Sequence, residues 1–163
     1  METMEARMVK LYARNNNHVA LHAIPGHFAT SHSHINFYID MTSLKTRANE
    51  AQEVAKSLAG DYVNSTVVDT IVCMDGTEVV GAYLAQEFEK RGFRNTNLHD
   101  TIYVVTPEYN ANNQLIFRDN TIPAIKGKNV ILLLATTTTG LTVRRSLECD
   151  CLCFPAFNLS PFM

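Results

Sequence analysis

The spacing of apolar residues changes several times along the chain, and each change predicts an element. In 5–14 (EARMVKLYAR) the apolar residues recur at helical intervals, which predicts a short opening helix. An apolar stretch over 18–24 follows, and the Pro25-Gly26 pair punctuates it. Residues 35–40 (INFYID) are mostly β-branched or aromatic, which is typical of a strand.

A helix is predicted directly after this strand. Thr42 or Ser43 offers a hydroxyl that can cap its first turn, and Gly60 is expected to end it. The residues expected on its buried face are Leu44, Ala48, Ala51, Val54, Ala55 and Leu58.

A strand, a tight turn and a helix follow one another over 70–91, and they form the clearest unit in the sequence. The short apolar run TIVCM predicts the strand, and Asp75-Gly76 predicts the turn. An amphipathic helix is expected over 77–91, ended by Gly92. Its apolar stripe consists of Val80, Leu84 and Phe88, widened by Val79 and Tyr83.

Two more strands are predicted, over 101–106 and 129–135. The first leads into the polar stretch PEYNANNQ, which indicates a mobile loop or the tip of a hairpin. The second (NVILLLA) is continuously apolar, as is typical of a parallel strand covered on both faces, and it opens into TTTTGLT before a helix near Thr142. Strands that alternate with helices predict an α/β fold with a mostly parallel central sheet flanked by helices, in a single domain over 1–163.

Composition excludes several classes of protein. Hydrophobic residues make up 46% and charged residues 18%, with a net charge of -2, so neither a disordered chain nor a nucleic-acid or anionic-membrane surface is expected. No apolar run approaches the roughly 18 residues that cross a bilayer. The first residues lack the apolar core of a secretory signal, and the four cysteines then favour a reducing, cytoplasmic setting without disulfides.

Histidine and cysteine patterns favour structural roles over metal binding. A zinc site needs further ligands beside a histidine pair and usually a C-x₂₋₄-C spacing, which the alternating CDCLC segment lacks. We therefore predict no metal site, with the CDCLC cysteines as a buried apolar face. The residues considered are His18, His22, His27, His32, His34, His99, Cys149, Cys151 and Cys153.

Two segments between a strand and a helix are candidates for binding, because ligands gather at the carboxyl ends of strands in open α/β sheets. They are 74–78 and 136–142. The second can cradle a phosphate with backbone N–H groups and hydroxyls from Thr138, Thr139, Gly140, Leu141 and Thr142. It lacks the GK[ST] ending of a Walker loop. The alternative is a threonine-rich turn that merely caps a helix.

From about residue 18 to 148 the chain resembles the type I phosphoribosyltransferases, and most closely the orotate phosphoribosyltransferases. The segments that carry the resemblance are HFATSHSHINFYIDM, TIVCMDGTEVVGAYLAQEF, TIYVVTPEYNANNQLIFRDNTIPAIKGKNVILL and NVILLLATTTTGLTVRRSLE. The resemblance implies a phosphoribosyltransferase-type fold, a phosphate loop over 138–142 and a pyrophosphate loop at Asp75, Gly76 and Thr77. It implies a nucleoside monophosphate, ribose 5-phosphate or phosphoribosyl pyrophosphate as ligand.

Three charge features of that family are missing. Leu134 and Ala135 occupy the positions of the two acids that contact ribose hydroxyls and magnesium in the family. The stretch that corresponds to the family's mobile loop has no lysine; it carries Glu108, and its nearest basic residue is Arg118. Upstream of the aromatic strand, SHSHINFY offers only histidines where the family has a basic residue.

These departures predict a protein that binds a nucleotide or ribose 5-phosphate with weak or lost transferase activity, so we assign no catalytic residues. Magnesium would be a cofactor only in an active transferase. Two alternatives stay open: an active phosphoribosyltransferase of nucleotide synthesis, for orotate or another base, and a structural or partner-binding protein with a vestigial pocket. A shortened sheet with an apolar edge also predicts a homodimer.

Overall fold

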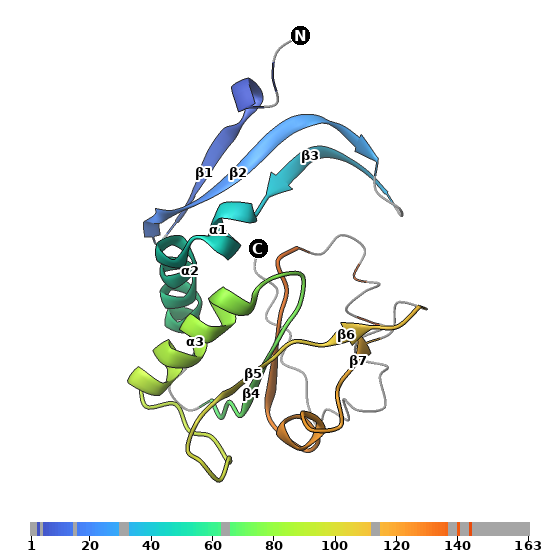
Figure 1. The fold of residues 1–163 in the computed structure, drawn as a ribbon. Coiled ribbons are helices and arrows are strands. Elements are labelled where there is room, and N and C mark those ends of the chain that lie inside the picture. Colours follow the sequence, from blue (N-terminus) through green and yellow to red (C-terminus); the bar gives the residue numbers. More distant parts are fainter. Residues whose placement is uncertain are drawn as a thin grey trace.

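The computed structural model has an antiparallel sheet at its N-terminal end, a layer of helices beside it, and a parallel sheet beyond the helices (Figure 1). It describes residues 3, 5–14, 16–29, 33–62, 66–111, 115–136, 140 and 144. This is a mixed α/β fold with three parallel strands packed against helices, and the predicted fold class is confirmed.

The N-terminal sheet consists of β1 (Val9–Ala13), β2 (Asn16–Ala29) and β3 (His34–Asp40), in that order and antiparallel. The helix predicted over 5–14 is therefore wrong: a 3₁₀ turn at Glu5–Arg7 precedes strand β1. Apolar and polar residues also alternate with period two from Val9 onward, and pairing with β2 from Val9↔Ala23 to Tyr12↔Ala20 selects that period.

The sequence analysis expected the Pro25-Gly26 pair to interrupt the apolar stretch before it. The structure shows no such interruption of the strand. Strand β2 continues past it to Ala29, and its pairing with β3 becomes irregular between Pro25 and Phe28. A proline has no N–H for the ladder, and its strand accommodates it at this irregularity. The strand predicted over 35–40 is confirmed as β3.

The helix predicted after β3 forms as two helices. They are α1 (Thr42–Thr46) and α2 (Ala48–Asp61), and Arg47 between them has an extended backbone. No side-chain cap is present at either start, so the predicted cap at Thr42 or Ser43 is wrong, and α2 runs one residue beyond Gly60. The buried residues are Leu44, Ala51, Ala55 and Ala59, whereas Ala48 is exposed.

The strand and helix predicted over 70–91 are confirmed as β4 (Thr70–Cys73) and α3 (Glu78–Lys90). Strand β4 is the centre of the parallel sheet, between β5 (Tyr103–Val105) and β8 (Val130–Leu133). The helices cover one face of this sheet, where Ile71 and Cys73 of β4 pack with Leu84 and Phe88 of α3. Of the predicted apolar stripe, Val80, Leu84 and Phe88 are buried and Tyr83 packs against the core, whereas Val79 is 38% exposed, so the predicted widening of the stripe by Val79 is wrong.

The opposite face of the parallel sheet is covered by the segment between β5 and β8. It forms a hairpin of β6 (Glu108–Tyr109) and β7 (Leu115–Ile116) and a 3₁₀ turn at Ile122–Ala124. Of the two alternatives for the polar stretch, the hairpin is confirmed. Its side chains bury the second core cluster: Val72, Met74, Val105, Leu115, Phe117 and Ile125.

Candidate functional site

The two loops singled out in the sequence follow neighbouring parallel strands. Strands β4 and β8 pair from Thr70↔Val130 to Cys73↔Leu133, so both end at the same edge of the sheet. The N–H of Met74 donates to the carbonyl of Leu133 at 2.9 Å, which extends the pairing to the start of the loop after β4. The described part of the site is built around this point.

The loop after β4 holds two consecutive residues in the left-handed region. Asp75 has φ 56° and Gly76 has φ 77°, as the predicted tight turn requires. Thr77, only 3% exposed, precedes α3, and its hydroxyl lies 2.8 Å from the carbonyl of Met74 and 3.2 Å from that of Leu133. The hydroxyl therefore ties the ends of β4 and β8 together and does not cap α3.

Lys45 is a basic residue at this loop that the sequence reasoning missed. Its Nζ donates to the carbonyl oxygen of Asp75 at 2.7 Å, and it lies 3.7 Å from the position that a Cβ on Gly76 would occupy. It comes from α1, 30 residues before Asp75. No local sequence motif links two residues that are so far apart along the chain. The sequence analysis looked for basic residues in the stretch after 101–106 and upstream of 35–40, and not at Lys45.

Asp75 on this loop and Glu78 at the start of α3 add negative charge here. Burial raises the pKa of the Tyr109 hydroxyl on β6, and the negative charge of Asp75 raises it further. Burial also raises the pKa of Cys73 to about 12, with a smaller contribution from the charge of Glu78. The thiol of Cys73 therefore stays neutral, and a thiolate is the form that reacts or binds metals.

Among the described residues of the hairpin segment, no cation contacts the loop after β4. Arg118, the basic residue that the sequence placed nearest to the mobile-loop stretch, instead pairs with Glu108 on the hairpin itself. Its Nε donates to Glu108 Oε1 at 2.7 Å, and its Nη2 contacts the same oxygen. The exposed pair satisfies both charges locally.

The loop after β8 lies partly outside the described residues. Thr138, Thr139, Leu141 and Thr142 are among those outside, as are His32 and the cysteines of CDCLC. Gly140 is described, and its φ of 71° is in the left-handed region, which the sequence interpretation expected of this glycine. The N–H of Arg144 donates to its carbonyl at 2.9 Å. Leu134, at one family acid position, packs against the second core cluster.

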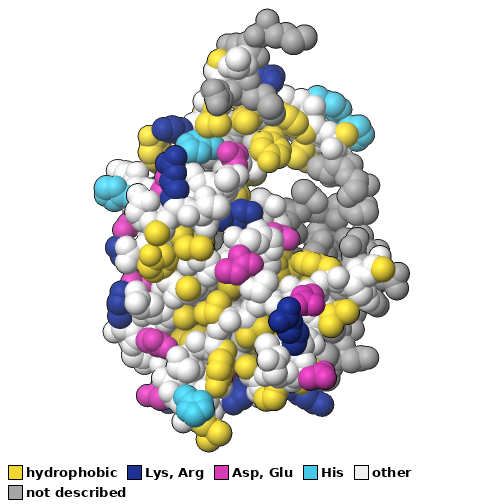
Figure 2. All heavy atoms as spheres, in the orientation of Figure 1, with side chains coloured by type: hydrophobic (Ala, Val, Ile, Leu, Met, Phe, Trp, Pro, Cys, Tyr) yellow, Lys and Arg dark blue, Asp and Glu magenta, His cyan; other side chains and the backbone are white. Residues whose placement is uncertain are grey.

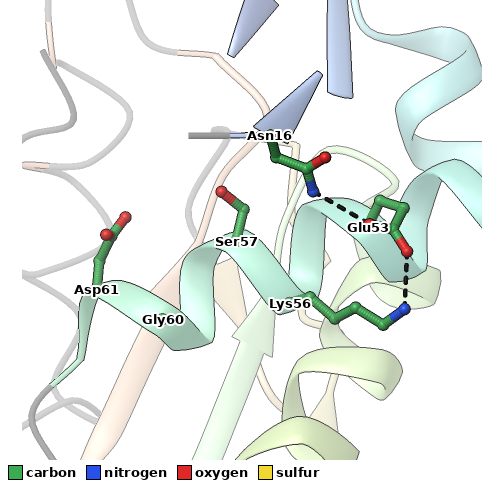
Figure 3. A pocket seen from close by; sticks show the side chains of 6 residues that line it. All are labelled: Asn16, Glu53, Lys56, Ser57, Gly60 and Asp61. Atoms are coloured by element: carbon green, nitrogen blue, oxygen red, sulfur yellow. Dashed lines mark hydrogen bonds and ion pairs between the residues drawn. The ribbon is translucent and has the colours of Figure 1, made fainter. Parts of the chain in front are cut away.

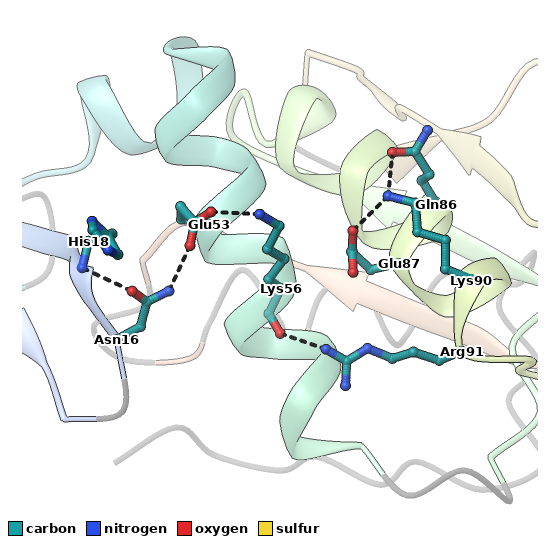
Figure 4. Close-up of polar contacts among 8 residues, drawn as sticks. All are labelled: Asn16, His18, Glu53, Lys56, Gln86, Glu87, Lys90 and Arg91. Atoms are coloured by element: carbon teal, nitrogen blue, oxygen red, sulfur yellow. Dashed lines mark hydrogen bonds and ion pairs between the residues drawn. The ribbon is translucent and has the colours of Figure 1, made fainter.

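Two open hollows among the described residues lie away from this edge. One is lined by Asn16, Glu53, Lys56, Ser57, Gly60 and Asp61 (Figure 3). The other, of ≈ 450 Å³, lies between strands β1 and β2 and helix α2. A chain of polar contacts runs beside them, in which Asn16 donates to Glu53 at 3.1 Å and Arg91 to the carbonyl of Lys56 at 3.4 Å (Figure 4).

Within the described ranges, no three His, Cys, Asp or Glu side chains gather where they could hold a metal ion. His34 Nδ1 and His27 Nε2 lie 2.9 Å apart across the β2–β3 ladder, so each of these nitrogens has the other as partner. Of the helices that are described, none has the length and apolar character to span a bilayer.

No protein-family model matches the chain, and no curated protein sequence matches it either. Among solved structures, the chain is similar to the orotate phosphoribosyltransferase of Mycobacterium tuberculosis H37Rv, crystallised in complex with Fe(III) dicitrate. The TM-score is 0.43 and the sequence identity 13%, over 78% of this chain and 68% of that chain. At this level the likeness is a distant one that concerns the fold alone.

Proposed function

We propose that this protein is an orotate phosphoribosyltransferase-like protein that binds the 5′-phosphate of a nucleoside monophosphate or of ribose 5-phosphate. In the proposal, the phosphate lies between the loop after β8, with Thr138, Thr139, Gly140, Leu141 and Thr142, and the loop after β4, with Asp75, Gly76 and Thr77. Transferase activity is weak or lost.

The observation that carries the proposal is the adjacency of β4 and β8 in one parallel sheet. It supports a shared ligand for the two loops, because the carboxyl ends of neighbouring parallel strands are where such folds bind ligands. The left-handed backbone at Gly140 and at Asp75-Gly76 also fits loops that turn their N–H groups toward an anion. Lys45, at 2.7 Å from the loop carbonyl, supplies a positive charge there.

The charges favour a single phosphate over a diphosphate. Asp75 and Glu78 are negative groups on or beside the loop where the family holds pyrophosphate, and Lys45 is the cation that contacts it in the described part of the chain. Leu134 and Ala135 offer no carboxylate to ribose hydroxyls or magnesium. Since electrostatic stabilisation is usually the largest catalytic contribution, we expect little turnover.

The binding experiment measures the melting temperature with ribose 5-phosphate and with uridine 5′-monophosphate, each with and without magnesium. At a concentration near 100 times Kd, about 2.7 kcal/mol of stabilisation is expected, equal in both conditions. Gly140→Val abolishes the shift, because a β-branched residue resists the positive φ. Lys45→Ala weakens binding about tenfold or more. The matched control is Lys126→Ala, an exposed lysine before the amino end of β8.

Each other outcome selects one of the alternatives. No shift with any millimolar 5′-phosphate favours the vestigial pocket. A shift that needs magnesium favours an active transferase. The companion assay follows the loss of orotate absorbance with phosphoribosyl pyrophosphate and magnesium, and turnover of about 1 per second or more contradicts the proposed loss of activity.

The remaining parts of the proposal rest on the sequence. It treats residues 1–163 as one phosphoribosyltransferase-like domain in a reducing, cytoplasmic setting, without nucleic-acid or membrane partners. Homodimer formation belongs to it as well.

A further inference from the structure

The hairpin of β6 and β7 carries a tyrosine near the edge of the parallel sheet where the two candidate loops begin. Tyr109 pairs directly with Leu115, so the two side chains share one face of the hairpin. Leu115 is 4% exposed and packs in one cluster with Met74, the residue that directly follows β4. The shared face is therefore turned toward the end of β4, and it brings the Tyr109 ring to the loop after that strand.

Tyr109 lies close to this loop and is only partly covered. Burial raises the pKa of its hydroxyl, and the negative charge of Asp75 raises it further, so the phenol and the carboxylate are near each other. The tyrosine is nevertheless 45% exposed. Hydrophobic side chains reach the surface over this hairpin (Figure 2). Part of the ring is thus packed against the protein, and part of it can contact a ligand.

The end of β8 is also apolar. Leu134 directly follows β8 and packs against the cluster that contains Met74 and Leu115. Its side chain has neither a charge nor a hydrogen-bonding group for the hydroxyls of a ribose. An aliphatic side chain and an aromatic ring at one edge of the sheet are better suited to the face of a flat ring, since aromatic faces stack on one another.

The charges beside Tyr109 are negative or already paired. Asp75 is on the loop, and Glu78 begins α3. Glu108, the neighbour of Tyr109 on β6, pairs with Arg118. A second phosphate beside the ring would be repelled by Asp75. An uncharged part of the ligand is therefore expected next to Tyr109.

We propose that Tyr109 stacks on the base of a bound nucleoside monophosphate, and that this contact makes the site prefer a nucleotide to ribose 5-phosphate. The inference rests on the proposed phosphate site and identifies what lies beside the sugar phosphate. Every nucleobase has a π-face, and removal of an aromatic side chain that stacks on it weakens binding by about 5- to 150-fold. The contact needs the ring of Tyr109 and not its hydroxyl.

Isothermal titration calorimetry with ribose 5-phosphate, uridine 5′-monophosphate and adenosine 5′-monophosphate tests this contact. The wild type should bind at least one of the two nucleotides about tenfold or more tightly than ribose 5-phosphate. Tyr109→Ala should abolish that preference and leave the Kd of ribose 5-phosphate unchanged. Tyr109→Phe should retain it, because the ring remains. The matched control is Tyr38→Ala on β3, at 46% exposed, which should also retain the preference.

Equal wild-type affinities for the three ligands overturn the inference and leave the phosphate site standing. So does a Tyr109→Ala variant that binds all three ligands more weakly by the same factor, because the ring would then only shape the hairpin. Equal losses in Tyr109→Phe and Tyr109→Ala overturn stacking in favour of a hydrogen bond from the hydroxyl. Loss of the preference in Tyr38→Ala overturns the inference by placing the base against the N-terminal sheet.

The failure of the phosphate site itself has a different signature. Wild-type protein that binds none of the three ligands contradicts the proposed function, and the inference about Tyr109 falls with it. If circular dichroism shows that Tyr109→Ala is unfolded, Tyr109→Leu takes its place, because leucine keeps an apolar contact with Leu115 and lacks the aromatic ring.

Discussion

The two sheets of this molecule differ in what their faces meet. In the parallel sheet, Ile71 and Cys73 contact the helices while Val72 contacts the hairpin side, and all three are 0% exposed. In the N-terminal sheet, one face contacts α2 and the other is exposed and apolar. Period-two alternation in a strand thus identifies two faces, but it does not say which of them is turned inward.

The helix layer explains why the parallel sheet is so well covered. Ala51, Ala55 and Ala59 form a stripe of small residues on α2, spaced at i, i+4 and i+8, and all are 0% exposed. Ala55 and Ala59 pack with Leu84 and Phe88 of α3 in one cluster. Small side chains permit a close approach of the two helices, and the N-terminal sheet has no comparable layer on its exposed apolar face within the described residues.

The largest contrast is expected between two phenylalanines, one in each region. Phe88 is 0% exposed, with the rings of Tyr62 and Phe93 at 5.4 and 4.5 Å, so Phe88→Ala should cost about 4 kcal/mol. Phe37 is 55% exposed, and Phe37→Ala should cost less than about 1 kcal/mol. Urea unfolding of the two variants beside the wild type measures both costs. Similar losses for the two variants would contradict this contrast.

Two aspartates give the next contrast. Asp69, before β4, is 0% exposed and accepts from the backbone and side chain of both Asn129 and Thr96, with both Asn129 nitrogens within 2.8 Å. Burial alone would raise its pKa, but these four donors outweigh it and hold the pKa below the usual value. Asp69→Asn replaces one of the two acceptor oxygens by an NH₂ group that faces buried donors, and it should cost about 3 kcal/mol.

The sign of the pH dependence follows from that lowered pKa. The contribution of Asp69 is fully present above the unfolded value of about 4 and is lost as pH falls through the folded pKa. The wild type should therefore lose stability below about pH 4 more steeply than Asp69→Asn. Asp40 is the control: its pKa is lowered by hydrogen bonds from Thr42, but it is largely solvated, so Asp40→Asn should cost less than about 1 kcal/mol.

Alanine substitutions at two helical glycines should change the free energy of unfolding by smaller amounts, and the two changes should have opposite signs. Alanine normally favours a helix over glycine by about 1 kcal/mol. A Cβ on Gly81 of α3, however, would lie 2.2 Å from the Sγ of Cys73, so Gly81→Ala should destabilise by about 2 kcal/mol. A Cβ on Gly60 of α2 meets nothing within 4 Å, and Gly60→Ala should stabilise by up to about 1 kcal/mol.

A double-mutant cycle checks the cause. Cys73→Ala removes the sulfur, so Gly81→Ala should cost little in that background, with a coupling of about 2 kcal/mol by urea unfolding. Equal costs of Gly81→Ala in both backgrounds would show that another contact limits the approach of α3.

The sequence predicted best where local pattern and tertiary packing agree. The unit from β4 to α3 has an apolar run, a turn that needs left-handed backbone and an amphipathic stripe, and each is present as predicted. Segment 5–14 was predicted wrongly because its apolar residues suit both a helix and a strand, and pairing with β2 decides. That pairing is not encoded within the segment.

The candidate site was predictable in outline only. The two strand-end loops were found because each follows an apolar strand, and their strands are indeed neighbours. Lys45 was missed because its approach to Asp75 depends on how α1 leaves the end of β3. The separation of α1 from α2 at Arg47 was also unpredicted, since no glycine or proline marks it.

The smallest effect is expected at the polar contacts that link the two regions. Glu53 of α2 accepts from Asn16 of β2 at 3.1 Å and from Lys56 at 2.7 Å, and these two bonds, the Lys56 bond first, lower its pKa. Water competes for the same groups, so Glu53→Gln should leave the melting temperature unchanged at both low and high salt. Ile24→Ala should lower it by several degrees, because Ile24 is 5% exposed on the inward face of β2. A drop for Glu53→Gln as large as that for Ile24→Ala would mean that polar contacts, and not apolar burial, hold the N-terminal sheet against the helices.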